Sequence, residues 1–201
     1  MLTVLDYGGG NLKSVVNMLD SFGFPYRLTD RAEDINAATQ LIFPGQGHFG
    51  QVMDSLRFRG LAEPLIQCLN RGVPFLGICV GLQVLFDSSE EAPGVSGLGV
   101  FKGKNVRFTQ GKVPQIGWNK IKTTPANTVL EDDFYYFVNS YHAVAENPRI
   151  VSATAEYHIP FTAAVQFENI TATQFHPEKS GLTGHTDIRN WITSFGVDAL
   201  A

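Results

Sequence analysis

The chain has 201 residues, and its 44% hydrophobic and 17% charged content is typical of a globular protein with a sizeable core. The formal net charge is −4 and no long run of one sign occurs, so we expect neither nucleic acid nor a membrane as a partner. The longest apolar runs are strand-sized, and the N-terminal segment lacks a basic region with a cleavage site, so no signal peptide is expected. Two cysteines without a secretory signal predict a reduced, cytoplasmic protein, and no spacing typical of a metal site occurs.

Strands and helices alternate through the first 86 residues, which predicts a parallel, doubly wound sheet. The first strand, over 2–7, turns through glycines 8–10 into a helix. Lys13 stands where a dinucleotide-binding fingerprint needs its third glycine, so we interpret this segment as a tight turn and expect no cofactor. The remaining elements predicted here are strands over 25–28, 40–43 and 73–78 and helices over 12–22, 32–38, 49–58, 61–69 and 82–86.

The second half of the chain has a different pattern. Residues 87–99 are polar and rich in Gly and Pro, and the runs that follow have a period closer to two. We interpret these runs as mostly antiparallel strands that extend the sheet or form a small second one: 103–108, 118–122, 134–139, 152–157, 161–167 and 170–175. A last helix is predicted over 188–195, with Thr186 and Asp187 as capping residues. No linker or repeat interrupts the chain, so we expect one α/β domain over 1–201, with helices on both faces of a mostly parallel sheet and an antiparallel extension.

The stretch Gly77-Ile-Cys-Val-Gly81 has the form of a nucleophile elbow, with cysteine in place of serine. An apolar strand leads into it and a helical run leaves it. Glycines at both flanks are needed because a Cβ there would crowd the neighbouring strand or helix. Cys79 would then lie at a helix N-terminus, where the thiolate form is favoured. The alternative, a small buried core cysteine, is the role we expect for Cys68 in the helix over 61–69.

A cysteine nucleophile needs a base, and the stretch Gln174-Phe-His-Pro-Glu178 supplies one. On extended backbone His176 and Glu178 point to the same side, and Pro177 favours that geometry and ends the strand. The carboxylate would orient one imidazole nitrogen and leave the other facing the thiol, which predicts a Cys-His-Glu triad. The other histidines are expected to be ordinary surface or turn residues, with only His48 near a candidate site: His48, His142, His158 and His185.

The Pro44-Gly-Gln-Gly47 loop follows the strand over 40–43, at the edge where an open α/β sheet binds its ligands. Its backbone N–H groups are candidate donors to a developing oxyanion. We call residues 44–47 the oxyanion loop.

Residues 77–83 and 174–180 together resemble the class I, triad-type glutamine amidotransferases. Further stretches are similar to one branch of that family, the glutaminase subunits of imidazole glycerol phosphate synthase: 6–14, 43–50, 89–99, 113–119 and 135–141. The resemblance covers nearly the whole chain. It implies that the protein hydrolyses glutamine to glutamate and passes ammonia to a separate cyclase, a β/α barrel that makes imidazole glycerol phosphate in histidine biosynthesis.

The resemblance also implies roles for single residues. Cys79 would be the nucleophile, His176 the base and then the acid, and Glu178 its orienter. Gln46, Gly47 and the Val80 N–H would form the oxyanion hole. Substrate glutamine would be held by Gln83, Glu91, Ser140 and Tyr141, and the cyclase would dock on Trp118, Asn119, Tyr136 and Lys179.

Two positions depart from the family pattern. Asn139 stands where a histidine is common, and Gln46 stands where an aliphatic residue is frequent. Alternatives within the same fold are a glutaminase subunit of another pathway and a γ-glutamyl hydrolase that needs no partner. A non-catalytic binding subunit is the alternative in another class, and the intact Cys79, His176 and Glu178 argue against it.

Overall fold

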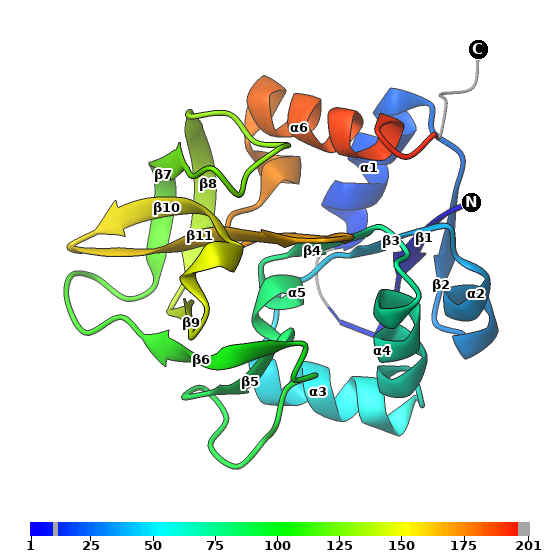
Figure 1. Cartoon of the computed structure of the whole chain (residues 1–201), viewed down its shortest axis with the longest axis horizontal. Coiled ribbons are helices and arrows are strands. Elements are labelled where there is room, and N and C mark those ends of the chain that lie inside the picture. The colour runs from blue at the N-terminus through cyan, green and yellow to red at the C-terminus, as the bar shows by residue number, and fades with distance from the viewer. Residues whose placement is uncertain (10–11, 197–201) are drawn as a thin grey trace.

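The computed structural model describes residues 1–9 and 12–196, and a nine-stranded mixed sheet runs through it (Figure 1). The order of the sheet is β2-β1-β3-β4-β12-β11-β10-β7-β8. Its first five strands are parallel to one another: β2 (Tyr26–Thr29), β1 (Leu2–Leu5), β3 (Gln40–Phe43), β4 (Phe75–Ile78) and β12 (Ile170–Thr173).

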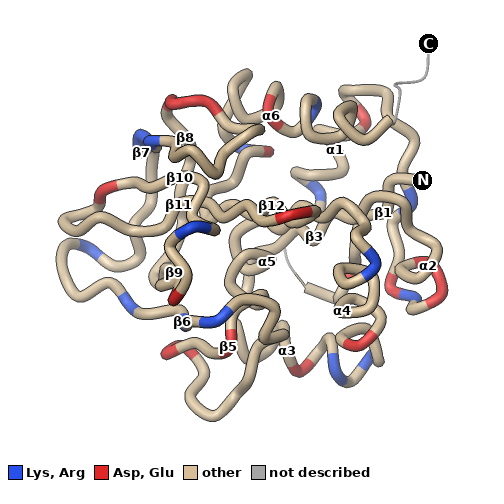
Figure 2. Tube along the Cα trace, viewed as in Figure 1, with Lys and Arg blue, Asp and Glu red and all other residues tan. Residues whose placement is uncertain are grey.

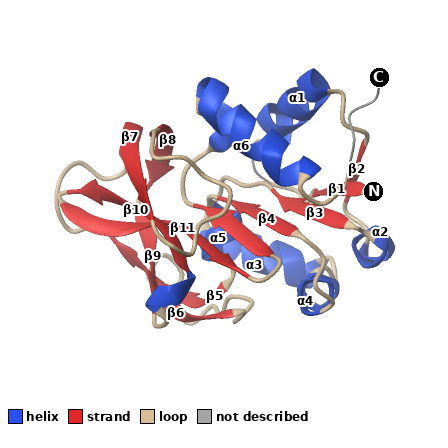
Figure 3. Ribbon diagram, turned by 45° about the horizontal axis from the view of Figure 1, so that its top comes forward, coloured by secondary structure: helices blue, strands red, loops and turns tan. Residues whose placement is uncertain are grey.

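Helices cover both faces of this parallel part (Figure 3). On one face, α1 (Leu12–Phe22) and α6 (Gly181–Thr193) bury Met18, Leu19 and Trp191 against alternate strand residues such as Val4. On the other, the buried residues of three helices pack against Leu5 and Phe43. These helices are α2 (Ala32–Ala37), α3 (Phe49–Phe58) and α4 (Ala62–Asn70). Because successive strand residues point to opposite faces, each strand contributes to both cores.

The antiparallel part continues the sheet beyond β12 and has its own core around Phe137 and Phe161. It consists of β11 (Ile159–Phe167), β10 (Val151–Tyr157), β7 (Gln115–Thr123) and β8 (Phe134–Asn139). A separate three-stranded sheet lies beside it, made of β5 (Phe86–Ser89), β6 (Phe101–Arg107) and β9 (Tyr141–Ala145). A 3₁₀ turn (Pro148–Ile150) precedes β10.

The predicted fold class is confirmed, while several element predictions were wrong. The helix predicted over 82–86 is α5 (Val80–Gln83), and Phe86 instead begins β5, where it pairs with Phe101. The last helix begins at Gly181, so Thr186 and Asp187 lie inside it and do not cap it. The strand predicted over 170–175, within a set expected to be mostly antiparallel, is β12, which joins the two parts: it is parallel to β4 and antiparallel to β11.

Figure 2 shows acidic and basic residues interspersed along the described part of the trace. Across residues 1–9 and 12–196, no helix is both long and apolar enough to cross a membrane. Cys68 is fully buried in α4, as predicted for a core residue. Of the glycine turn after the first strand, Gly10 and Asn11 lie outside the described residues.

Candidate functional site

Parallel neighbours in the sheet bring distant segments together at one edge. Phe43 lies beside Gly77 in the β3–β4 register, and Ile78 lies beside Thr173 in the β4–β12 register. The chain leaving each strand therefore emerges next to the chain leaving its neighbour, at the carboxyl edge where open α/β sheets bind ligands. The segments that meet there are the end of β1 with Tyr7, the oxyanion loop after β3, the elbow after β4 and residues 174–180 after β12.

Cys79 occupies a strained turn between β4 and α5. Its φ of 54° and ψ of −103° are unusual for a residue with a side chain, and its N–H donates to the Thr173 carbonyl at 2.7 Å. The flanking glycines have the predicted steric role. A Cβ on Gly77 would lie 2.6 Å from the Gly81 carbonyl oxygen, and one on Gly81 would lie 2.4 Å from that of Phe43. The elbow predicted from the sequence is confirmed in its geometry.

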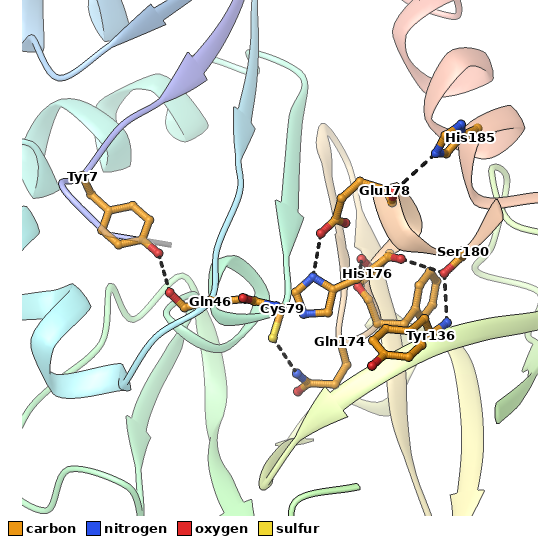
Figure 4. Close-up of polar contacts among 11 residues, drawn as sticks. Tyr7, Gln46, Cys79, Tyr136, Gln174, His176, Glu178, Ser180 and His185 are labelled. Carbon is orange, nitrogen blue, oxygen red and sulfur yellow. Dashed lines mark hydrogen bonds and ion pairs between the residues drawn. The ribbon is translucent and has the colours of Figure 1, made fainter. Parts of the chain in front are cut away.

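His176 and Glu178 point toward each other as the sequence predicted (Figure 4). His176 Nδ1 and Glu178 Oε1 are 2.8 Å apart, and both side chains are almost completely buried. The second ring nitrogen, Nε2, has no hydrogen-bond partner among the described residues and lies next to Cys79. A buried imidazole held by a carboxylate on one side and open on the other can accept and return a proton.

The charges around His176 favour the imidazolium. Burial lowers the pKa of His176, but the Cys79 sulfur and then the Glu178 carboxylate raise it by more, so the net shift is upward. Tyr7, buried on the far side of the oxyanion loop, has a raised pKa because of burial first and of Cys79 second. The phenol is therefore neutral and donates a hydrogen bond.

One side-chain hydrogen bond, from that phenol, holds the oxyanion loop in the conformation described here. The Tyr7 hydroxyl donates to the Gln46 carbonyl at 3.1 Å, and Figure 4 shows Tyr7 and Cys79 on opposite sides of Gln46. Gly45 must lack a side chain, because a Cβ there would lie 2.3 Å from Val80 Cγ1. The structure thus brings Gln46, Gly47 and Val80 together beside Cys79, as the sequence predicted.

A cavity of about 290 Å³ opens at Cys79 and is lined by all four residues predicted to bind the substrate. A larger cavity, of about 430 Å³, is lined by the opposite end of β12 at Ile170 and has none of the predicted site residues. The predicted site residues therefore gather at the smaller one. Its lining consists of Gln46, Gly47, Cys79, Gln83, Glu91, Pro114, Val138, Asn139, Ser140 and Tyr141.

Two predicted substrate residues also have structural partners. Glu91 Oε2 accepts a hydrogen bond from the Phe49 N–H at 2.7 Å, which leaves its other oxygen for a ligand. Gln83 Nε2 donates to the Tyr141 carbonyl at 3.1 Å. Sequence reasoning missed Gln174, whose Nε2 lies 3.7 Å from Cys79 Sγ. Its place two residues before His176 on extended backbone was the available signal.

The predicted docking residues do not all share one face. Trp118 and Tyr136 are cross-strand partners on the β7–β8 ribbon, with ring centroids 6.1 Å apart. Asn119 points to the other face and donates to the Glu156 carbonyl at 2.8 Å. Lys179 lies in the 3₁₀ turn (Pro177–Lys179) next to the His176–Glu178 pair. Sequence reasoning missed three further exposed apolar residues, Ile116 and Phe134 on the same ribbon and Leu182 at the start of α6.

The other histidines have mixed roles. His142 was expected to be a surface or turn residue, and that was wrong, because it is 5% exposed and packs on Phe108. Burial lowers the pKa of His142. His48 caps α3 by accepting a hydrogen bond from the Gly50 N–H at 3.2 Å. Among residues 1–9 and 12–196, no group of three or more His, Cys, Asp or Glu side chains is arranged to hold a metal ion.

Comparison with known proteins identifies relatives of the whole chain. The family described as "Glutamine amidotransferase class-I" matches residues 3–193. An imidazole glycerol phosphate synthase subunit HisH from Deinococcus radiodurans is 43% identical over 195 residues, covering 94% of this chain and 91% of the relative. The protein of the same name from Thermus thermophilus is 45% identical over 181 residues, covering 90% of this chain and 91% of the relative.

Solved structures share the fold at low identity. A crystal structure titled as a glutamine amidotransferase superposes with a TM-score of 0.73 at 19% identity, covering 98% of this chain and 99% of that one. A chain of PurLQS from Thermotoga maritima gives a TM-score of 0.73 at 20% identity, covering 96% of this chain and 97% of that one.

Proposed function

Because the chain belongs to the class I glutamine amidotransferases, and among them to the glutaminase subunits of imidazole glycerol phosphate synthase, we propose that Cys79, His176 and Glu178 form its catalytic triad. The observation that carries this proposal is the buried His176–Glu178 pair, 2.8 Å apart, with the free ring nitrogen next to the elbow cysteine. The reaction is hydrolysis of glutamine to glutamate and ammonia.

The first half of the reaction forms a thioester. The Cys79 thiolate attacks the side-chain amide carbon of glutamine, and the carbonyl oxygen becomes an oxyanion beside the oxyanion loop and the Val80 N–H. His176 then donates its proton to the leaving nitrogen, so the C–N bond breaks and ammonia departs. The raised pKa of His176 means that the imidazolium is available as this acid at neutral pH.

The second half returns the enzyme to its starting state. With ammonia gone, neutral His176 takes a proton from water, and the resulting hydroxide attacks the thioester. The C–S bond breaks, glutamate leaves and the thiolate is restored. Glu178 remains hydrogen-bonded to Nδ1 throughout, which fixes the tautomer that leaves Nε2 free for the proton.

Glutamine itself would occupy the 290 Å³ cavity. The carboxylate of Glu91 suits the substrate's α-ammonium group, and the backbone of Ser140 and Tyr141 suits its α-carboxylate. Gln83 lines the same wall. Free glutamine, with both charged groups on its α-carbon and a neutral amide at the far end of its side chain, matches this arrangement, which is why we assign it as the substrate.

The partner would be a cyclase that docks on the β7–β8 ribbon. Trp118 is 56% exposed, and with Tyr136, Ile116 and Phe134 it forms an apolar face of a kind that marks protein interfaces. The ribbon also contacts the triad segment through its backbone, since the His176 N–H donates to the Tyr136 carbonyl at 2.9 Å. A movement of this ribbon on docking would therefore be transmitted to His176 through this hydrogen bond. Such a pathway enzyme would act in the cytoplasm.

The partner would also control the rate. Ammonia lost to water becomes ammonium, which is not a nucleophile, so uncoupled hydrolysis wastes glutamine. Misorienting one oxyanion donor reduces a rate by about 10²–10³. Gln46, between two glycines, can reorient at little cost. Partner and cyclase ligand then need only bind one loop state more tightly to shift the populations.

The test is glutamate production by the lone subunit, by the subunit with its cyclase, and by the pair with the cyclase's ligand. We expect the last rate to exceed the first by about 10²-fold or more, the size of a restored oxyanion donor. Cys79→Ala is the blank in each arm. A lone subunit that already runs at the stimulated rate would refute the gating while leaving the triad intact. Activity toward γ-glutamyl peptides without a partner would instead identify a hydrolase.

A further inference from the structure

The polar network around Cys79 contains a second group that reaches the sulfur. Gln174 is fully buried, and its side-chain nitrogen lies 3.7 Å from Cys79 Sγ (Figure 4). It extends from the same segment as His176, two residues earlier, so both side chains approach the cysteine from the end of β12. The triad mechanism gives this amide no task.

The orientation of the Gln174 amide is fixed by its neighbours. The Tyr141 carbonyl oxygen accepts from Gln83 Nε2 at 3.1 Å and from Asn139 Nδ2 at 3.0 Å. A backbone carbonyl can only accept, so Gln83 must turn its NH₂ group toward it. The same nitrogen of Gln83 also donates to Gln174 Oε1 at 3.1 Å.

This chain leaves Gln174 one possible arrangement. If its amide were turned over, its NH₂ would face the NH₂ of Gln83, and its oxygen would face the sulfur. In the observed arrangement an N–H points at Cys79 Sγ. We call the chain of hydrogen bonds from the Tyr141 carbonyl through Gln83 and Gln174 to the sulfur the relay. Because the Tyr141 carbonyl can only accept, it sets the donor and acceptor of every hydrogen bond in the relay.

Resting on the triad proposed above, we infer that Gln174 is a hydrogen-bond donor that stabilises the Cys79 thiolate, oriented by Gln83 and the Tyr141 carbonyl. A donor to a charged acceptor stabilises it more than a donor to a neutral one. The N–H favours the thiolate over the thiol, independently of the His176 imidazolium. Asn139, which departs from the family pattern, anchors the far end of this relay.

Other ionisable groups face Cys79 and must stay constant in any test. They are His176 with Glu178 behind it, Tyr7 across the oxyanion loop and Glu91 across the cavity. None of them touches the Gln174 side chain by a hydrogen bond among the described residues. Replacing Gln174 by an uncharged side chain of similar length therefore removes the N–H that points at the sulfur, together with the acceptor for Gln83, and leaves these ionisable groups in place.

The experiment measures the rate at which iodoacetamide alkylates Cys79 in the lone full-length subunit, as a function of pH. Mass spectrometry reads Cys79 and Cys68 separately, and Cys68 is the internal reference because burial raises the pKa of its thiol. In Gln174→Met we expect the pH profile of Cys79 to move upward by about one pH unit. Gln40→Met is the matched control, since Gln40 is an equally buried amide bonded to the Ile192 carbonyl, and its profile should match wild type.

Overlapping profiles for folded Gln174→Met and wild type would overturn the inference. If Gln174→Met does not fold, side-chain amide NMR of the wild-type subunit decides instead. One glutamine NH₂ resonance should move with the Cys79 titration and stop doing so in Cys79→Ala, and the absence of any such resonance would overturn the inference. Neither readout needs glutaminase activity, so failure of the triad proposal, seen as activity in Cys79→Ala, is a separate result.

Discussion

The parallel and antiparallel parts of the sheet contribute to the site in different ways. The parallel part places the proposed reactive groups at turns that follow its strands, where sterics restrict the backbone, as at Cys79 between Gly77 and Gly81. The antiparallel part lines the cavity and, through the register of β7 and β8, presents the proposed docking face. Strand β12 belongs to both, and the segment that follows it contains His176. The proposed catalytic residues thus depend on local turns, whereas the proposed docking face depends on pairing between strands.

The largest effect should come from the parallel part. Cys79→Ala should reduce glutamine hydrolysis by at least about 10⁴-fold, because the nucleophile is removed while the elbow glycines still allow the turn. Glutamate release with the stimulating partner present is the measurement. Cys68→Ala is the control, and its activity should stay within a few-fold of wild type. Substantial turnover by Cys79→Ala would show that Cys79 is not the nucleophile.

The next effect concerns the strand that joins the two parts. His176→Ala should cost about 10⁴-fold in kcat, because it removes the group that we propose transfers the proton. Glu178→Gln should cost less, about 10²-fold, since the histidine remains and only its orientation and charge support are lost. The kcat values of both variants, measured with partner, make the comparison. Equal losses would show that the hierarchy within the triad is wrong.

Substitutions in the proposed docking face test the role of the antiparallel part. Trp118→Ala should weaken cyclase binding by about 30-fold or more, because a large exposed aromatic is a typical interface anchor. Lys179→Ala should reduce stimulation by the cyclase ligand while lone-subunit hydrolysis stays unchanged. Titration of glutamate production with cyclase measures both. Phe58→Ala, which changes a 94% exposed aromatic on α3, is the matched control. A larger loss of cyclase binding in Phe58→Ala than in Trp118→Ala would show that the interface is not on the β7–β8 ribbon.

The smallest effect is on stability, at the contact between α6 and β8. The Tyr135 hydroxyl donates to Asp187 Oδ2 at 2.5 Å, and burial, more than the nearby Glu131 and Asp133, raises the pKa of Asp187 to about 7. The folded state therefore binds more protons than the unfolded state between about pH 4 and 7. Its stability should fall as pH rises through that window, by an amount on the order of 2 kcal/mol.

Asp187→Asn keeps an acceptor for Tyr135 without a charge, and it should flatten the dependence. Urea unfolding at pH 5, 6, 7 and 8 measures it. Asp54→Asn, on α3, is the control variant and should keep the wild-type slope. An Asp187→Asn curve parallel to wild type would assign the pH dependence to other groups.

Residue pattern was enough to predict the parallel part. The spacing of apolar residues, with the Gly, Pro and polar residues between them, located β1, β3, β4, α1, α3 and α4, because the amphipathic or buried character of these elements is local. The prediction from residue pattern failed at Phe86, because an apolar run after the elbow fits a helix or a strand equally well. Pairing with Phe101 decides for β5, and a partner strand cannot be read from a single run. The early start of α6 was missed because Gly181 and Gly184 are poor helix formers.

The sequence by itself determined which residues we propose as reactive, since a cysteine flanked by glycines and a histidine two residues before a glutamate are local patterns with local geometry. Only the tertiary structure decided which side chains meet. The parallel pairing of β4 with β12 places Cys79 beside His176, although 97 positions of chain separate them. It also gives Gln174 its donor orientation through Gln83 and the Tyr141 carbonyl, which come from two other segments. Hydrogen bonds between distant segments have no periodicity in the sequence, so the relay to the sulfur appears only once the chain is folded.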